Sequence, residues 1–330
     1  MNSDMLKRLF RAIRDSDSPD MRKLAGAILE DERKKSHDIL AKELEDILSR
    51  SSRTGLERHV ERNHTEGNLR SLPKSKRSNE PLASLFPTIL LRHHMVLRAD
   101  VEARLRRIEC EYAARERLAR HGFGYRRRVL LFGPPGCGKS LSAERLAWTT
   151  GLPLLKVRFD AIISSYLGES SSNLRCVFDS ARESPCLLFL DECDFVARSR
   201  TSQHDVGEMP RIVNTLLQLL EENDSPGLIV AATNLETSLD TAMFRRFDDV
   251  IEIPRPGVHE AEELLRMTLS SVQVADALLW RELAEKMLGM SAAAIVKSAQ
   301  DGAKTAILQN SLPVGNDHVL SALAEVRRDD

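Results

Sequence analysis

The stretch that decides the fold reads Gly133-Pro134-Pro135-Gly136-Cys137-Gly138-Lys139-Ser140, directly after the apolar run Val129-Leu130-Leu131-Phe132. A buried strand that delivers a glycine-rich loop into a helix is the pattern of a phosphate-binding loop. Glycines let successive backbone N–H groups converge on a phosphate chain without Cβ clashes, and the start of the helix adds its own free N–H groups. The sequence therefore predicts a nucleotide-binding α/β domain, with Gly133 to Ser140 and the next residue, Leu141, at the nucleotide.

Lys139 and Ser140 end this loop and begin the predicted helix. In loops of this kind the lysine reaches the β- and γ-phosphates of ATP, and the serine hydroxyl binds Mg²⁺. We therefore expect ATP and Mg²⁺ as cofactors.

A second motif, Cys186-Leu187-Leu188-Phe189-Leu190-Asp191-Glu192, is a short apolar run that ends in two carboxylates. Such a run suits a strand buried on both faces of a parallel sheet, whose end lies at the carboxyl edge where open α/β sheets bind ligands. Asp191 is then expected to support the Mg²⁺ ion, and Glu192 to orient and polarise a water molecule against the γ-phosphate.

Two further stretches follow these motifs. Leu228-Ile229-Val230-Ala231-Ala232-Thr233-Asn234 is another apolar run with a polar end, and the segment from Leu239 to Asp248 comes next. This order of motifs closely resembles the AAA+ ATPases, specifically the clade of katanin-like severing enzymes, membrane-anchored AAA proteases and proteasomal ATPases. The resemblance runs from about Phe123 to about Ala306. It implies an α/β P-loop NTPase module, with a parallel sheet and flanking helices, followed by a helical lid.

The same resemblance assigns roles to three polar residues. Asn234 matches the sensor asparagine that detects the γ-phosphate, and Arg245 and Arg246 match the arginine fingers that act at a neighbouring subunit's ATP. The family usually places two residues between its two arginines, whereas here they are adjacent. We favour Arg246 as the finger because Phe247-Asp248 follows it as in the family, although an isolated arginine pair more often forms a surface ion pair.

Tyr166-Leu167-Gly168 matches the pore loop that lines the central channel of a ring and grips an extended polypeptide. The resemblance thus implies a homo-oligomer, expected to be a hexamer, that remodels or unfolds a protein substrate through its pore. Two alternatives stay open: a nucleotide-gated adaptor that recruits a separate effector such as a protease, and a nucleic-acid-linked loader. The tyrosine loop disfavours the loader.

Composition sets limits on function. The chain has 330 residues, 42% of them hydrophobic, and a net charge of -1, which argues against nucleic-acid binding through bulk charge. Its five cysteines show no C-x-x-C spacing, which suits a reducing cytoplasm. No apolar run approaches the roughly 20 residues that span a bilayer, so we expect no membrane contact.

The pattern divides the chain into four parts. Residues 1–50 carry three amphipathic stripes and are predicted to be an N-terminal helical module that binds a protein substrate or adaptor, or only supports oligomerisation. Residues 51–80 are polar and are interpreted as a flexible linker, residues 81–256 as the large α/β ATPase subdomain, and residues 257–330 as the lid.

Periodicity predicts helices at both ends of the ATPase module. An arginine-rich helix is expected after Pro87, with an apolar stripe at Leu97, Val101, Leu105, Ile108 and Tyr112. We interpret its arginines as a solvated face balanced by glutamates rather than as a basic patch for an acidic partner or nucleic acid. The lid is predicted to hold four helices, at about 258–270, 275–288, 291–309 and 316–327.

Overall fold

A computed structural model describes residues 72–75, 79–163, 169–193, 208–234 and 244–329. The predicted N-terminal helical module and most of the predicted linker lie outside these residues, as do the segments 164–168, 194–207 and 235–243.

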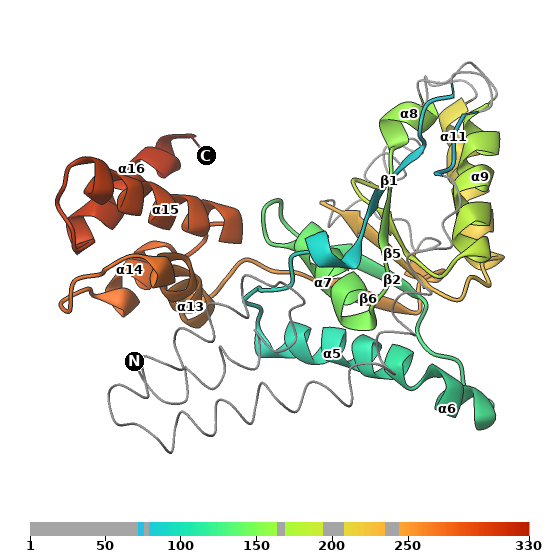
Figure 1. The fold of residues 1–330 in the computed structure, drawn as a ribbon, viewed down its shortest axis with the longest axis horizontal. Coiled ribbons are helices and arrows are strands. Elements are labelled where there is room, and N and C mark those ends of the chain that lie inside the picture. Colours follow the sequence, from blue (N-terminus) through green and yellow to red (C-terminus); the bar gives the residue numbers. More distant parts are fainter. Residues whose placement is uncertain (1–71, 76–78, 164–168, 194–207, 235–243, 330) are drawn as a thin grey trace, which may run out of the picture. The chain divides into compact units, whose positions relative to one another are not determined.

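A six-stranded sheet forms the centre of the described ATPase module (Figure 1). Its order is β1 (Ala83–Phe86), β3 (Leu154–Val157), β4 (Leu187–Leu190), β5 (Leu228–Thr233), β2 (Arg128–Phe132) and β6 (Asp249–Glu252). The pairs from β3 to β6 are parallel, and only β1 runs antiparallel, against β3. The predicted α/β architecture is therefore confirmed, with one antiparallel strand added at the edge of a parallel sheet.

Helices cover both faces of this sheet because its strands are apolar on both sides (Figure 1). Alternate residues of β2 show the division: Leu130 belongs to one core and its neighbours Val129 and Leu131 to the other. The Leu130 core is closed by α8 (Phe159–Ile163), α9 (Ser170–Glu183) and α11 (Glu208–Glu221). The opposite core is closed by α5 (Ala99–Ala113) and α7 (Lys139–Thr150).

Helix α5 shows why an arginine-rich sequence can cover a hydrophobic core. Val101, Leu105, Ile108 and Tyr112 are buried against the sheet, as the spacing predicted. Most of the arginines on the other faces pair with acids, for example Arg106 with Glu102 and Arg107 with Glu111. The interpretation as a balanced, solvated face fits these contacts. Beyond Ala114, the short helix α6 (Arg115–Arg120) continues the chain.

The lid contains helices α13 (Val258–Thr268), α14 (Trp280–Lys286), α15 (Ala292–Leu308) and α16 (Asn316–Asp329), with a 3-10 turn η2 (Leu269–Ser271) after α13. They enclose a third core around Leu265, Ile295 and Val319. The second predicted helix begins too early, because the bridge between Val274 and Val314 and a turn within residues 275–279 precede α14, which starts at Trp280.

Three strands were missed from the sequence, β1, β3 and β6, and the 3-10 turn η1 (Thr88–Leu90) stands where only an approach to the helix was expected. The linker boundary was also placed too late. Leu82 N donates to Pro73 O at 2.8 Å and Ser75 N to Glu80 O at 2.9 Å, and Ser75 is buried. Residues 72–75 and 79–80 thus belong to the sheet module, since their backbone bonds lead directly into β1.

Candidate nucleotide site

Three predicted site segments meet at the carboxyl edge of the sheet. Gly133 follows β2, Asp191 and Glu192 follow β4, and Asn234 follows β5. These three strands are neighbours, with Phe132 opposite Thr233 and Leu190 opposite Ala231, so their ends lie side by side. The Cys193 N–H donates to Ala232 O at 2.9 Å and ties the turn after β4 to β5. The sheet topology therefore brings the two predicted motifs and Asn234 together.

The phosphate loop depends on glycine at two positions that the structure explains directly. Gly133 has φ +138°, and a Cβ there would lie 2.3 Å from the backbone oxygen of Ile253. Gly136 has φ +71°, and a Cβ there would lie 2.9 Å from Ser291 Oγ. Both conformations are costly for residues with a side chain, and both glycines also admit a close neighbour.

The loop leads into α7, which begins at Lys139 as predicted. Lys139 is buried, and its Nζ donates to Gly133 O at 2.7 Å and to Pro134 O at 2.8 Å. The ammonium group is thus held inside the loop, where the predicted phosphate chain would lie.

Ser140 and Asp191, predicted as metal-binding residues, are in contact. The Ser140 hydroxyl donates to Asp191 Oδ2 at 3.2 Å, which links α7 to the end of β4. Oxygen ligands of this kind, a hydroxyl and a carboxylate, suit Mg²⁺ bound together with nucleotide phosphates. Sequence reasoning missed a third residue of this hydrogen-bonded group: Lys156 of β3 donates from Nζ to the same Asp191 Oδ2 at 2.7 Å. Its only sequence signal is a lysine within the apolar stretch Leu154–Val157.

Glu192 has an unusual backbone. Its φ is +54°, a left-handed conformation that few residues other than glycine adopt, and its N–H donates to Asp191 Oδ1 at 3.0 Å. The side chain is exposed at the end of β4. Strained residues of this kind gather at functional sites, because the surrounding structure must hold them there.

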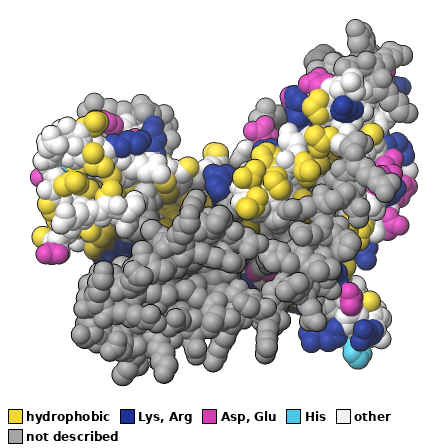
Figure 2. Space-filling model, in the orientation of Figure 1, with side chains coloured by type: hydrophobic (Ala, Val, Ile, Leu, Met, Phe, Trp, Pro, Cys, Tyr) yellow, Lys and Arg dark blue, Asp and Glu magenta, His cyan; other side chains and the backbone are white. Residues whose placement is uncertain are grey.

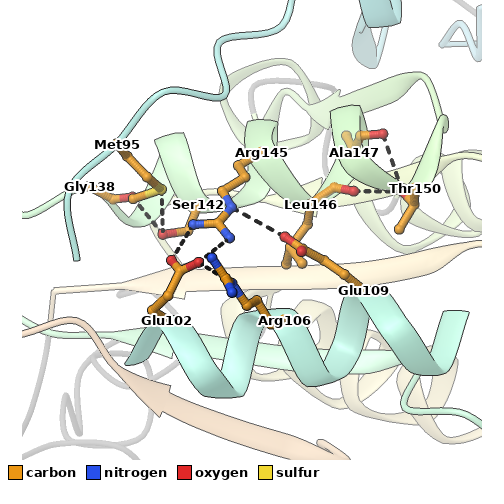
Figure 3. Close-up of polar contacts among 10 residues, drawn as sticks. All are labelled: Met95, Glu102, Arg106, Glu109, Gly138, Ser142, Arg145, Leu146, Ala147 and Thr150. Carbon is orange, nitrogen blue, oxygen red and sulfur yellow. Dashed lines mark hydrogen bonds and ion pairs between the residues drawn. The ribbon is translucent and has the colours of Figure 1, made fainter. Parts of the chain in front are cut away.

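An ion-pair cluster holds α7 against α5 beneath the loop (Figure 3). Arg145 of α7 binds Glu102 at 2.8 Å and Glu109 at 3.2 Å, and Arg106 binds Glu102 from its own helix at 2.7 Å. The hydrogen bond from Arg145 lowers the pKa of Glu102 to about 2. Figure 3 also draws the Ser142 hydroxyl between Gly138 O and the Met95 sulfur, so the segment before α5 reaches the loop as well.

The lid contacts the phosphate loop through the start of α15. Ser291 caps this helix by accepting from Ala294 N at 3.2 Å, and Ala293 N donates to Gly136 O at 3.0 Å. A small hollow of about 10 Å³ lies beside this contact, lined by residues that include Val96, Leu97, Cys137, Pro256 and Ala292. The loop, the segment before α5 and the lid thus surround one hollow, whose lining is apolar apart from Arg98, Arg255 and Glu260.

The two predicted finger arginines lie at the other end of the sheet. Asp248 N donates to Arg128 O at 2.8 Å, which places the Arg245-Arg246 turn beside the amino end of β2. Phe244, the residue before Arg245, packs its ring 6.4 Å from the ring of Phe132, which precedes Gly133. The turn thus joins β2 at its amino end, while Phe244 extends along the strand toward the phosphate loop.

The arginines also differ from each other. Arg246 Nε lies 2.7 Å from Glu221 Oε1, and its side chain is 24% exposed, whereas Arg245 is exposed. Buried Phe247 and the Asp248 carboxylate, which accepts from the N–H groups of Arg127 and Arg128, fix the turn behind them. A charged hollow of about 550 Å³ adjoins this turn and includes Glu221 and Asp248, far from the phosphate loop along β2.

The predicted pore loop, Tyr166-Leu167-Gly168, lies outside the described residues.

Comparison with known proteins identifies the family of this chain. Residues 129–255 match the model of the "ATPase family associated with various cellular activities (AAA)". An uncharacterized AAA family ATPase of Sinorhizobium fredii, y4kL, is 36% identical over 276 residues, which are 82% of this chain and 80% of that protein. This chain belongs to the AAA ATPase family.

Other relatives place it within the family. A proteasome-activating nucleotidase of Methanosarcina mazei is 31% identical over 227 residues, 66% of this chain and 54% of the relative. The ATP-dependent zinc metalloprotease FtsH of Methylococcus capsulatus is 33% identical over 195 residues, 57% of this chain and 31% of the relative. The resemblance to proteasomal ATPases and AAA proteases is thereby confirmed, and the chain is an AAA+ ATPase that binds and hydrolyses ATP. Among the described residues, no helix is long and apolar enough to cross a membrane.

Proposed function

We propose that this AAA+ ATPase forms a ring, a hexamer, and uses Mg²⁺-dependent ATP hydrolysis to remodel or unfold a protein substrate through the central pore. One observation carries the ring: the phosphate loop and the arginine turn occupy opposite ends of β2 within one chain. When subunits pack head to tail, an arginine on the turn at the amino end of β2 can complete the nucleotide site of a neighbouring subunit.

The carboxyl edge supports the proposed chemistry. Lys139 binds the β- and γ-phosphates, Ser140 and Asp191 hold Mg²⁺, Glu192 polarises the attacking water, and Asn234 senses the γ-phosphate. When bound, Mg²⁺ neutralises charge on the phosphate oxygens. The Ser140–Asp191 contact of 3.2 Å and the exposed Glu192 at the strand end favour these roles.

The hollow beside the loop is our proposed place for adenine. Its lining is mainly apolar, and it adjoins Gly136 and the start of α15 through the Ala293–Gly136 hydrogen bond. Because about 10 Å³ holds no more than one water molecule, adenine entry requires the lid to move relative to the loop. This coupling would link nucleotide occupancy to lid position.

Protein remodelling and a cytoplasmic location are proposed from the relatives and from the state of the cysteines. A proteasome-activating nucleotidase and FtsH are relatives, and the five cysteines are all free, which suits a reducing compartment. The Tyr166-Leu167-Gly168 loop is proposed to grip the substrate, and residues 1–50 to bind a substrate or adaptor.

Two substitutions test the chemistry. Glu192→Gln is expected to keep ATP binding and lose hydrolysis by about 10²-fold or more, because an amide cannot polarise water as a carboxylate does. Lys139→Ala is expected to lose binding itself. Bound nucleotide and phosphate release are measured for both variants. Hydrolysis at the wild-type rate by Glu192→Gln would contradict the role of Glu192 in activating water.

The pore is tested with Tyr166→Ala and, as its control, Tyr166→Phe. The aromatic face supplies the proposed grip, so only the alanine variant should lose remodelling while basal ATPase stays at the wild-type level. Nucleotide-dependent protection of a model unfolded protein against an added protease reports the interaction. A Tyr166→Ala protein that loses thermal stability and ATPase together would contradict the pore assignment.

A further inference from the structure

Lys156 is the one charged residue in a strand that otherwise packs into the core. In β3, Leu154 and Lys156 share the sheet face covered by α7, while Leu155 and Val157 point to the other core. The stem of Lys156 passes the ring of Phe189 on the neighbouring strand, with Nζ 5.7 Å from the ring centre. The backbone of β3 thus aims this lysine at the end of β4.

The ammonium group shares an oxygen with the proposed metal ligands. Asp191 Oδ2 accepts from Lys156 Nζ at 2.7 Å and from the Ser140 hydroxyl at 3.2 Å. Lys156 Nζ therefore lies within about 6 Å of Ser140 Oγ, by adding these two distances. Ser140 and Asp191 would hold Mg²⁺ through this hydroxyl and carboxylate, which are oxygen ligands of the kind the ion prefers. The ammonium group already occupies the carboxylate oxygen that the ion would share.

The surroundings allow this lysine to withdraw. Its side chain is 42% exposed, whereas that of Asp191 is 19% exposed, so the lysine is the partner with solvent beside it into which it can turn. Glu144 lies one helical turn beyond Ser140 on α7 and interacts electrostatically with Lys156. Glu144 itself is bound by Arg92 at 2.7 Å. A second acidic group therefore lies near the path of the ammonium group when it leaves Asp191.

We propose that Lys156 competes with Mg²⁺ for Asp191: it orders the Asp191 carboxylate, and it raises the Mg²⁺ concentration at which the ATPase binds metal together with nucleotide. This inference rests on the Mg²⁺ role proposed above for Ser140 and Asp191. It assigns Lys156 a positioning role rather than a catalytic one.

Removing the charge should lower the Mg²⁺ requirement. Lys156→Met keeps an apolar stem beside Phe189 and deletes the ammonium group. We expect the half-saturating Mg²⁺ concentration to fall about 3- to 10-fold, the size of repulsion between an ammonium and a divalent cation about 5 Å apart in a water-like dielectric, reduced because the lysine can swing away. Lys156→Arg keeps the charge and should stay close to wild type.

The measurement is a Mg²⁺ titration of full-length protein with a fluorescent ADP analogue, starting from EDTA. Lys304→Met is the matched control, because Lys304 pairs with Asp301 at 2.8 Å on the lid helix α15 and should leave the titration unchanged. Binding of the analogue in EDTA is measured alongside, and it should be equal or weaker in Lys156→Met, since a positive charge near the phosphates is lost.

The outcomes separate this inference from the proposal beneath it. A half-saturating Mg²⁺ concentration that is unchanged or raised in Lys156→Met, while the wild type responds to Mg²⁺, would overturn the competition. A parallel loss of binding with and without Mg²⁺ would also overturn it, because that is the signature of a merely structural lysine. No Mg²⁺ response in the wild type would instead remove the metal assignment of Ser140 and Asp191.

Discussion

Gly136→Ala tests whether the lid and the phosphate loop act as one site. The substitution adds a single methyl group where the loop passes the start of α15. Its Cβ would lie 2.9 Å from Ser291 Oγ and 3.3 Å from the Cβ of Ala293. Both neighbours belong to the lid, so the perturbation acts between the loop and the lid.

The expected loss has two parts. Alanine at φ +71° costs about 1–2 kcal/mol of conformational strain. Ser291 Oγ can move aside only by leaving Ala294 N, and loss of such a helix cap costs about 1 kcal/mol. The free energy of unfolding should therefore fall by about 2–3 kcal/mol, or roughly 5–10 °C in melting temperature for a domain of this size.

Gly151→Ala is the matched control. Gly151 ends the same helix α7 with φ +73°, and a Cβ there would meet nothing within 4 Å. It carries the strain without the clash, so it should lose about 1–2 kcal/mol and bind ADP within about twofold of wild type. Gly136→Ala should weaken ADP binding about 10-fold or more, because displacing α15 breaks the Ala293–Gly136 hydrogen bond beside the nucleotide.

The assay combines thermal unfolding with ADP titration of the three proteins. A double variant, Gly136→Ala with Ser291→Gly, removes the closest obstructing atoms and should recover part of the lost affinity. Wild-type ADP affinity in Gly136→Ala would refute the reasoning. Equal loss of affinity in the single and double variants would show that loop strain, and not the lid contact, weakens binding.

Three further outcomes are expected. The pKa of Glu102 lies near 2 in the folded chain, below its ordinary 4.5. The contribution of Glu102 to stability is therefore present above about pH 5 and is lost as the pH falls toward 2. In Glu102→Gln, the melting temperature should fall less between pH 5 and 3 than it does in the wild type. Phe178→Ala should lower the free energy of unfolding by about 3–5 kcal/mol, measured by denaturant unfolding, because Phe178 is fully buried against the sheet. A loss below about 1 kcal/mol would contradict its place in the core. Arg245→Ala and Arg246→Ala, each measured alone and mixed with Lys139→Ala subunits, should identify the arginine that acts on a neighbour's ATP. That arginine is the one whose variant loses about 10³-fold in ATP turnover alone and regains part of this turnover in mixed rings. If neither variant regains turnover although the subunits are shown to co-assemble, the result counts against a ring.

Local patterns determined much of the catalytic module. The apolar runs ending in Phe132, Leu190 and Thr233 were recognisable as strands because parallel strands are buried on both faces, and the polar residues after them predicted a shared edge. Motif spacing also indicated the helix that starts at Lys139 and, with the resemblance, three of the four lid helices to within a few residues. Features that depend on neighbouring residues, such as glycine in a loop or an apolar stripe on a helix, can be recognised from the sequence alone.

Strands with weaker patterns depended on their partners. β1 is four residues long, and its Leu85 and Phe86 are partly exposed, so it is a strand only because β3 supplies the hydrogen bonds. β6 begins with the charged Asp249, and β2 beside it defines its register. Residues 72–75 read as linker because they belong to the mostly polar stretch 51–80, in which nothing signals that Leu82 and Glu80 bond to Pro73 and Ser75.

The electrostatics of the site required the tertiary structure for the same reason. Nothing in the sequence relates Lys156 to Asp191, 35 residues away, or Arg246 to Glu221, because each pair meets only when separate elements pack together. The sequence by itself predicted which residues carry phosphate chemistry. Folding alone decided which charge neutralises which, and that the arginine turn joins β2 at its amino end while the phosphate loop follows its carboxyl end, because β6 and β2 pair in parallel.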